Sequence, residues 1–346
     1  MPLADAATYP IFVNVLIFMA AAAIILVSGA RLTRHLDTIA LKTSLDHAFV
    51  GMLLLGGITS LPEVANTITA SSIGNPALAV NNLLGSAAIN VVLLAIVDGF
   101  IGRAAVTSIV AHPSTMMMAS LCMIVLILIA AIITVGDVAL GGVGIGSVAV
   151  AGASIFSFWV AAGHDRRSPW SVDEDGDGPP DVNEEDPEPG ATLTALWLRT
   201  AMDGVLIFAA GYVISQTGDA IAHQAGLTSA IVGFALIGTA TSLPELVTIV
   251  VALRLGRPEM AFGQVLGTNF VNLALIPLGD LVFRGKPILN MLGRFEILSC
   301  LLGAMLIGIF MVGLLEHRDR TIFKMGVDSA LVLALFAAGI AVLASL

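Results

Sequence analysis

Long apolar stretches alternate with short polar connections along the 346 residues of the chain. A helix needs about 20 apolar residues to cross the hydrocarbon core of a bilayer. Ten stretches meet this requirement, and each predicts a membrane-spanning helix: 10–33, 47–72, 76–98, 114–135, 139–162, 194–215, 228–253, 258–283, 295–315 and 324–346. The polar segment 163–193 separates two halves, 1–162 and 194–346, so we predict an all-α polytopic membrane protein with five helices in each half.

The composition excludes a soluble protein. Hydrophobic residues make up 57% of the chain and charged residues only 12%, whereas soluble domains carry about 25% charged residues. Nine of the 25 acidic residues lie between Asp173 and Glu188, so the net charge of −10 describes this segment rather than a surface. The lipid bilayer is the expected partner, no nucleic-acid partner is expected, and the sequence leaves protein partners open.

The distribution of Lys and Arg predicts the orientation, because cytoplasmic loops are enriched in basic residues. With the N-terminus outside, twelve basic residues fall in inner loops and only Arg284, Lys286 and Arg294 fall outside. Both termini are then predicted outside the cell, and the acidic segment 163–193 is predicted to be a cytoplasmic loop. We expect a multi-pass protein of the inner or plasma membrane.

The two halves contain an internal repeat. A gapless shift that places Gly51 on Gly233 aligns Gly51–Phe100 with Gly233–Val282 and gives 17 identities in 50 positions, with the core motifs at 51–98 and 233–280. Thr-Ser-Leu-Pro-Glu occurs in both copies. A repeat of five spans places the copies upside down relative to each other, the arrangement of many secondary transporters. Pro and polar residues predict broken second and seventh helices. An ancient duplication of a purely structural bundle is the alternative.

Two carboxylates stand out at the centre of predicted spans. Glu63 is the only charged residue between Asp46 and Asp98, and Glu245 is followed by eight uncharged residues before Arg254. Ten other acidic residues are predicted to be interfacial or capping: Asp37, Asp46, Asp98, Asp137, Asp203, Asp219, Asp280, Glu296, Asp319 and Asp328. A charge at the bilayer centre costs at least ~2.5 kcal/mol, and no buried Lys or Arg is expected nearby. The partner is therefore predicted to be a cation or a proton.

The side chains around these carboxylates carry oxygen. They are the hydroxyls of Thr59, Ser60, Thr241 and Ser242 and the helix-face pairs Ser86 with Asn90 and Thr268 with Asn272. With carbonyls exposed at the helix breaks, they form an all-oxygen set that suits Ca²⁺ or Na⁺ rather than Zn²⁺ or Cu. One Ca²⁺ or two Na⁺ would neutralise two carboxylates, and competition for this cage is a basis for antiport. Two protonated glutamates that only hold helices together are the alternative reading.

These doubled motifs resemble the α-repeats of sodium/calcium exchangers, members of the calcium/cation antiporter superfamily. The resemblance covers the ten-span layout. It implies that Glu63 and Glu245 coordinate the transported cations, with the hydroxyl and amide residues named above completing the cage. It also implies carbonyl ligands at Gly56 and Gly238. In this family the first and sixth spans slide across the remaining bundle to alternate access.

The second motif departs from the usual family pattern. Asn272 stands where several members have Asp, which lowers the negative charge of the site and leaves the number and identity of coupled ions open. A Gly-Asn-x-x-Glu type motif, usual in proton-driven relatives, is absent from the sequence, which favours Na⁺ over H⁺. We predict a Ca²⁺/Na⁺ antiporter without a cofactor and not an enzyme, because Ser60 and Ser242 have no His or Lys base in reach within their spans. A Ca²⁺/H⁺ or other cation/H⁺ antiporter is the nearest alternative, followed by a cation channel.

The acidic segment carries a separate motif. Asp173, Asp175, Asp177 and Glu184 fit the spacing of an EF-hand calcium loop. Pro179 follows the central glycine directly, and no convincing helices flank the loop. A regulatory Ca²⁺ site and a solvated acidic linker are both compatible with this segment, and the linker is favoured.

Overall fold

The computed structural model describes residues 6–45, 47–101, 113–164, 188, 190–225, 232–316, 321–322 and 325–346, and these are mostly helical. The first half contains η1 (Ala6–Thr8), α1 (Ile11–Thr43), α2 (His47–Val50), the π-helical turn η2 (Gly51–Leu55), α3 (Gly56–Thr59), α4 (Leu61–Ser72), α5 (Pro76–Ile101), α7 (Pro113–Val135), β1 (Ala139–Leu140), β2 (Val143–Gly144) and α8 (Ile145–His164). The second half contains α9 (Leu193–Gln224), the π-helical turn η4 (Val232–Ile237), α11 (Gly238–Thr241), α12 (Leu243–Arg254), α13 (Pro258–Ala274), α14 (Ile276–Phe283), the 3-10 helix η5 (Ile288–Met291), α15 (Arg294–Glu316), β3 (Thr321–Ile322), β4 (Met325–Gly326) and α16 (Val327–Leu343).

Six helical segments among the described residues are long and apolar enough to cross a membrane. They are Ile11–Thr43, Pro76–Phe100, Ser114–Val135, Leu193–Gly218, Pro258–Phe283 and Arg294–Glu316. The helices α8 and α16 are also apolar but contribute shorter segments. A mostly helical protein that crosses the membrane several times is thereby supported, and the count of ten spans stays a prediction.

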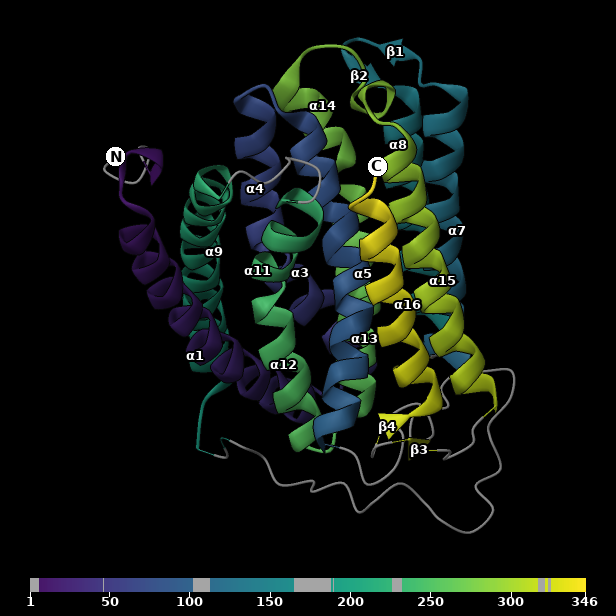
Figure 1. Ribbon diagram of the computed structural model, residues 1–346. Coiled ribbons are helices and arrows are strands. Elements are labelled where there is room, and N and C mark those ends of the chain that lie inside the picture. Colours follow the sequence, from purple (N-terminus) through teal and green to yellow (C-terminus); the bar gives the residue numbers. More distant parts are fainter. Residues whose placement is uncertain are drawn as a thin grey trace.

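The element boundaries recur at the spacing of the sequence repeat. Helix α1 begins at Ile11 and α9 at Leu193, α4 at Leu61 and α12 at Leu243, α5 at Pro76 and α13 at Pro258, and α8 at Ile145 and α16 at Val327. Each of these pairs has the same separation along the chain as Gly51 and Gly233, and so do the first strands of the two antiparallel hairpins, β1–β2 and β3–β4. Figure 1 shows the two hairpins at opposite ends of the molecule. The correspondence therefore extends over both halves, well beyond the motif.

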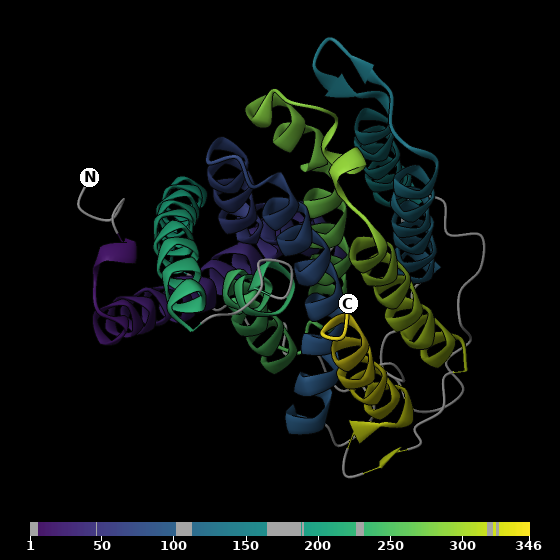
Figure 2. The same cartoon turned by 45° about the horizontal axis from the view of Figure 1, so that its top comes forward.

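Helices α1 and α9 lie side by side at one edge of the molecule, as Figures 1 and 2 show. Helices α7, α8, α15 and α16 form the opposite edge, and α5 and α13 occupy the centre (Figure 1). The interrupted helices lie between the two groups, where α1 packs against α12 and α9 against α4. Fully buried aromatic side chains, among them Phe234, Phe262 and Phe270, fill the interior.

Helices α1 and α9 are both longer than predicted, because charged residues beyond the predicted ends at 33 and 215 continue the helices and some are buried. His35 lies between two carboxylates, with Nε2 3.1 Å from Glu188 Oε1 and Nδ1 3.2 Å from Asp203 Oδ2. His35 and Asp203 are 5% and 4% exposed. The interfacial position predicted for Asp203 is therefore wrong: a partner on the neighbouring helix compensates its burial, as a buried ionisable group requires.

Asp37 is likewise buried rather than interfacial. Its Oδ1 lies 3.0 Å from Arg257 Nε and 3.0 Å from His47 Nε2. Arg257 is only 7% exposed, so a buried Arg does occur, but its partner is Asp37 rather than a site glutamate. This cation compensates Asp37, and the contact fastens the end of α1 to the turn before α13.

The fifth and tenth predicted spans begin with hairpins rather than helix. Residues 139–144 turn through Gly141 and Gly142, whose φ angles of 62° and 91° are left-handed and favour glycine. The equivalent strands at 321–326 precede α16. Helix therefore starts several residues later than the apolar pattern predicted, at Ile145 and Val327.

Asp98 and Asp280 connect the two halves. Asp280, which is 2% exposed, accepts hydrogen bonds from Ile288 N at 2.6 Å and Gly144 N at 3.1 Å, and from Ser147 Oγ at 2.5 Å. Asp98, 1% exposed, accepts from Gly326 N at 2.7 Å. Both aspartates therefore accept hydrogen bonds at the beginnings of other helices, which agrees with the predicted capping role, and each also holds a hairpin of the other half.

Replacing Asp280 by Asn should destabilise the protein by about 1.5 kcal/mol. The two carboxylate oxygens accept the three hydrogen bonds, and the substitution turns one of these oxygens into an amide group that donates instead. Thermal unfolding of the detergent-solubilised protein checks this. Glu316→Gln makes the same change from carboxyl to amide at an exposed position and serves as the control. An unchanged unfolding temperature for Asp280→Asn would show that these contacts add nothing to stability.

Candidate cation site

Both broken helices are interrupted one residue before the Leu-Pro-Glu of the repeat. Ser60 separates α3 from α4, and Ser242 separates α11 from α12. The prolines that follow lie in the first turn of the new helix, where the missing N–H costs least. Glu63 and Glu245 thus lie in the first turns of α4 and α12, and the positive end of each helix dipole favours a carboxylate there.

Residues of three segments, α4, α5 and α11, meet at Glu63. Its side chain is fully buried, and Oε1 accepts a hydrogen bond from Ser86 Oγ of α5 at 3.1 Å. Ser86 Oγ lies 3.2 Å from Thr241 Oγ1 of α11, which donates to Asn82 Oδ1 at 3.2 Å. The fold therefore brings Glu63, Ser86 and Thr241 together, although they are far apart in the sequence.

Glu245 is fully buried beside Thr59 and close enough to Glu63 for the two carboxylates to repel each other. Neither oxygen of Glu245 has a hydrogen-bond partner among the described residues, and the same holds for Glu63 Oε2. Three of the four carboxylate oxygens are thus buried without a donor in the described part of the protein. Such groups are costly and call for an explanation, such as an ion that the protein binds.

The two glycine carbonyls lie at equivalent places in the halves. Thr268 Oγ1 is 3.4 Å from Gly56 O, and Ser86 Oγ is 3.5 Å from Gly238 O. A Cβ on Gly56 would lie 2.9 Å from Thr268 N, so only glycine permits this approach. Each carbonyl therefore reaches the hydroxyl residue contributed by the other half.

The remaining predicted residues differ in their contacts. Ser60 Oγ donates to Gly56 O at 2.8 Å, whereas Ser242 Oγ has no partner in the part of the chain that the structure describes. Asn90 Nδ2 donates to Asn269 Oδ1 at 3.0 Å. Both side-chain polar atoms of Asn272 are buried without a partner among these same residues. The amide of Asn90 is thus partly engaged by Asn269, whereas both polar atoms of Asn272 remain available to bind a cation or water.

Three further polar residues adjoin the predicted set. Asn82 contacts Thr241, Asn269 contacts Asn90, and Gln264 donates to Thr248 Oγ1. Asn82 and Gln264 were detectable from the sequence, since they precede Ser86 and Thr268 by four residues and therefore share their helix faces. Asn269 was not, because its equivalent in the first half is Ala87.

The whole constellation contains two carboxylates and many neutral oxygens. No cluster of three or more His, Cys, Asp or Glu side chains suited to a metal ion occurs among the described residues. The donors are those preferred by hard cations with flexible coordination. The residues Asp173, Asp175, Asp177 and Glu184 of the predicted calcium loop lie outside the described residues.

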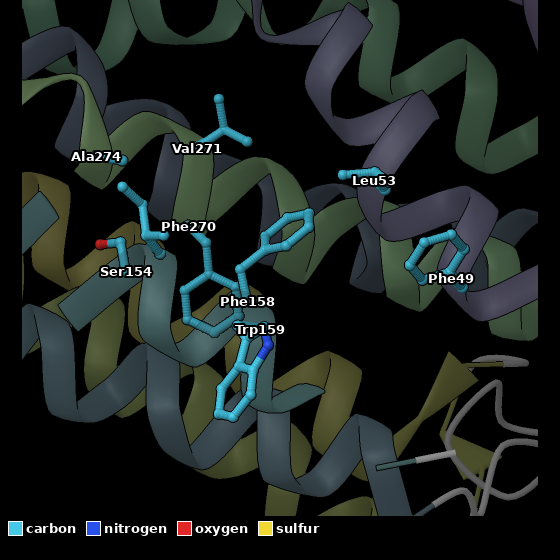
Figure 3. Close-up of a pocket in the computed structure, with 9 residues that line it drawn as sticks. Phe49, Leu53, Ser154, Phe158, Trp159, Phe270, Val271 and Ala274 are labelled. Carbon is cyan, nitrogen blue, oxygen red and sulfur yellow. The ribbon is translucent and has the colours of Figure 1, made fainter. Parts of the chain in front are cut away.

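An apolar groove of about 430 Å³ lies between α2, η2, α8 and α13, and its lining residues are not those of the predicted cage. Figure 3 shows Phe49 and Leu53 on one side of it and Phe158, Trp159 and Phe270 on the other. Its one hydroxyl, from Ser154, donates to the backbone of its own helix. The groove offers contacts for hydrocarbon rather than ligands for a cation.

Comparison with known proteins identifies relatives. A family model described as sodium/calcium exchanger protein matches residues 13–161 and 195–345. The candidate antiporter CaxA of Alkalimonas amylolytica is 23% identical over 262 residues, which make up 75% of this chain and 77% of CaxA. The sodium/calcium exchanger MaX1 of Methanosarcina acetivorans is 42% identical over 55 residues, or 16% of each chain. A structure of the sodium-calcium exchanger NCX_Mj superposes with a TM-score of 0.67 and 16% identity, covering 96% of this chain and 99% of that chain.

Proposed function

Because the chain belongs to the sodium/calcium exchanger protein family, we propose that it is a secondary active antiporter that exchanges Ca²⁺ for Na⁺ across the cell membrane. The observation that carries this proposal is the pair of fully buried carboxylates, Glu63 and Glu245, with three of their four oxygens free of hydrogen-bond partners among the described residues. The cage that we assign to the cations consists of Glu63, Glu245, Thr59, Ser60, Thr241, Ser242, Ser86, Thr268, Asn90, Asn272 and the carbonyls of Gly56 and Gly238.

The contacts of Glu245 argue against two protonated glutamates that only hold helices together. A protonated carboxyl in such a role would donate a hydrogen bond to a neighbouring helix, since an unpaired buried polar group is destabilising. Glu245 makes no such bond to the described part of the chain. A cation accounts for its free oxygens, and it also relieves the repulsion between the two carboxylates.

We propose that charge compensation couples the transport of Ca²⁺ to that of Na⁺. The ionised site carries a charge near −2, which one Ca²⁺ or two Na⁺ neutralise. Burying an uncompensated charge is expensive, so the empty, ionised site resists the occluded state in which neither side of the membrane has access. The helices then move with Ca²⁺ bound or with Na⁺ bound, and exchange of one cation for the other follows.

The architecture we propose is ten membrane-spanning helices in two inverted repeats, with both termini outside and the acidic segment 163–193 in the cytoplasm. The element boundaries that recur at one fixed separation support the repeat, and the hairpins at opposite ends support its inversion (Figure 1). A five-span unit requires that inversion. Glu63 and Glu245 then face each other from equivalent places in the two halves.

Movement of the pair α1 and α9 against the rest of the protein is the proposed route to alternating access. Gly29 of α1 faces Pro244, and Gly211 of α9 faces Pro62, so each long helix presents a glycine to the proline next to a site glutamate. A smooth surface at these two contacts favours sliding. The pairing of His35 with Asp203 keeps α1 and α9 together as one moving unit.

The purified protein in proteoliposomes tests the proposal. With ⁴⁵Ca²⁺ outside, an outward Na⁺ gradient alone should drive uptake, whereas a pH gradient alone should not. Uptake with the pH gradient alone would identify a Ca²⁺/H⁺ antiporter instead. Uptake without any counter-ion would identify a channel, and liposomes without protein are the control.

A further inference from the structure

A row of polar side chains runs along one face of α4, away from the site. Glu63, Thr67 and Ser71 are spaced by four residues, which aligns them on a helix. Thr67 and Ser71 are each only 1% exposed. The row thus leads from the site glutamate to the last turn of α4, through the interior of the protein.

The hydroxyls of this row lack the bond that helical hydroxyls usually make. Thr69 on the same helix donates to Ala65 O, four residues earlier, at 2.8 Å. Thr33, Thr43, Ser120, Thr134, Ser154 and Ser299 do the same on other helices. Thr67 Oγ1 and Ser71 Oγ have no partner among the residues described, although both are buried. Their oxygens are therefore free to bind something else.

Helix α14 passes close beside the row. Its Gly279 faces both residues, since a Cβ there would lie 3.4 Å from Ser71 Oγ and 3.9 Å from Thr67 Cγ2. Ile288 of η5 is the other neighbour at this point and is fully buried. The Ser71 hydroxyl and the Thr67 methyl group thus lie against a glycine, with an apolar side chain beside them.

The second half lacks this feature at every position. In the alignment of the two halves, Ile249 is the equivalent of Thr67, Leu253 is the equivalent of Ser71, and Val97 is the equivalent of Gly279. Ile249 and Val97 are 0% and 2% exposed. Packing of the fold alone is therefore satisfied by apolar residues, and the polar row is a property of one side of the protein.

We propose that Thr67 and Ser71 form a weak intermediate binding site for the transported cation, between Glu63 and the outer end of α4. This inference rests on the proposed function. Two neutral oxygens beyond the site carboxylate would replace part of the hydration shell of Na⁺ or Ca²⁺ as it enters from outside. Neutral hydroxyls bind such ions weakly enough to release them towards Glu63. At the equivalent positions of α12, on the predicted cytoplasmic side, Ile249 and Leu253 offer no oxygen for such a site.

Thr67→Val and Ser71→Ala remove the oxygens with little change of shape. Each should raise the KM for Ca²⁺ applied to the outer face about fivefold, the effect of losing one weak polar contact. The KM at the cytoplasmic face should stay unchanged. Uptake of ⁴⁵Ca²⁺ into right-side-out and inside-out membrane vesicles measures the two values separately.

Two variants distinguish a binding role from a structural one. Thr67→Ser keeps the hydroxyl and should retain the wild-type KM, and Thr69→Val removes a hydroxyl that is bonded within the helix and should also retain it. An unchanged KM in Thr67→Val and Ser71→Ala, or an equal rise at both faces, would overturn the inference. Failure of the wild-type protein to exchange in the same vesicles would instead contradict the proposed function.

Discussion

Replacing Glu63 or Glu245 by Gln is expected to abolish cation exchange while the protein still folds. Gln keeps the shape and one oxygen, but it removes half of the negative charge of the site. Loss of one partner from a buried charge contact costs about 3 kcal/mol, or roughly a hundredfold in the binding constant. The remaining single charge no longer balances a Ca²⁺ ion, so occlusion becomes unfavourable as well.

Both binding and transport should be measured for these variants. Isothermal titration with Ca²⁺ in detergent gives the loss of affinity, and ⁴⁵Ca²⁺ flux in proteoliposomes gives the loss of exchange. Glu316→Gln, at the exposed end of α15, is the matched control and should transport normally. Normal flux in Glu63→Gln or Glu245→Gln would show that the two carboxylates are not the cation site.

The sequence points to this candidate site because lipid penalises charge. An unpaired glutamate in the middle of an apolar span has few explanations, and a second one at the equivalent position of a repeat has fewer. Contacts between helices were harder to foresee. Asn269 belongs to the polar network through Asn90, which is distant in sequence, and its equivalent in the first half is Ala87.

The contacts of four buried aspartates were hard to foresee for the same reason, because their partners lie on other elements. Asp37, Asp98, Asp203 and Asp280 lie near the ends of predicted spans, where a charge usually meets water or headgroups. In the structure each finds a partner on another element: Arg257, Gly326, His35, and the residues around Gly144. Sequence patterns show where a charge must be compensated, whereas tertiary packing decides which group does so.

Alanine at Gly85 or Gly267 should strongly destabilise the interior. A Cβ on Gly85 would collide with the backbone of Phe234, and a Cβ on Gly267 would collide with the backbone of Met52. These are the same contact in the two halves, where a π-helical turn packs on the central helix of the opposite half. Backbone cannot rotate away as a side chain can, so we expect each variant to lose about 3 kcal/mol of stability.

The rate of cation exchange should fall in these variants even at temperatures where the protein remains folded. Gly85 precedes Ser86 and Gly267 precedes Thr268, so displacement of either helix moves a hydroxyl of the proposed cage away from the glycine carbonyl opposite. Thermal unfolding in detergent and ⁴⁵Ca²⁺ flux at a temperature where both variants are folded separate the two effects. Gly152→Ala on α8 is the control, because a Cβ there meets nothing within 4 Å. In a helix this change should be neutral or stabilise by up to about 1 kcal/mol. If Gly85→Ala and Gly267→Ala behave like the control, the close contact between the halves does not position the site.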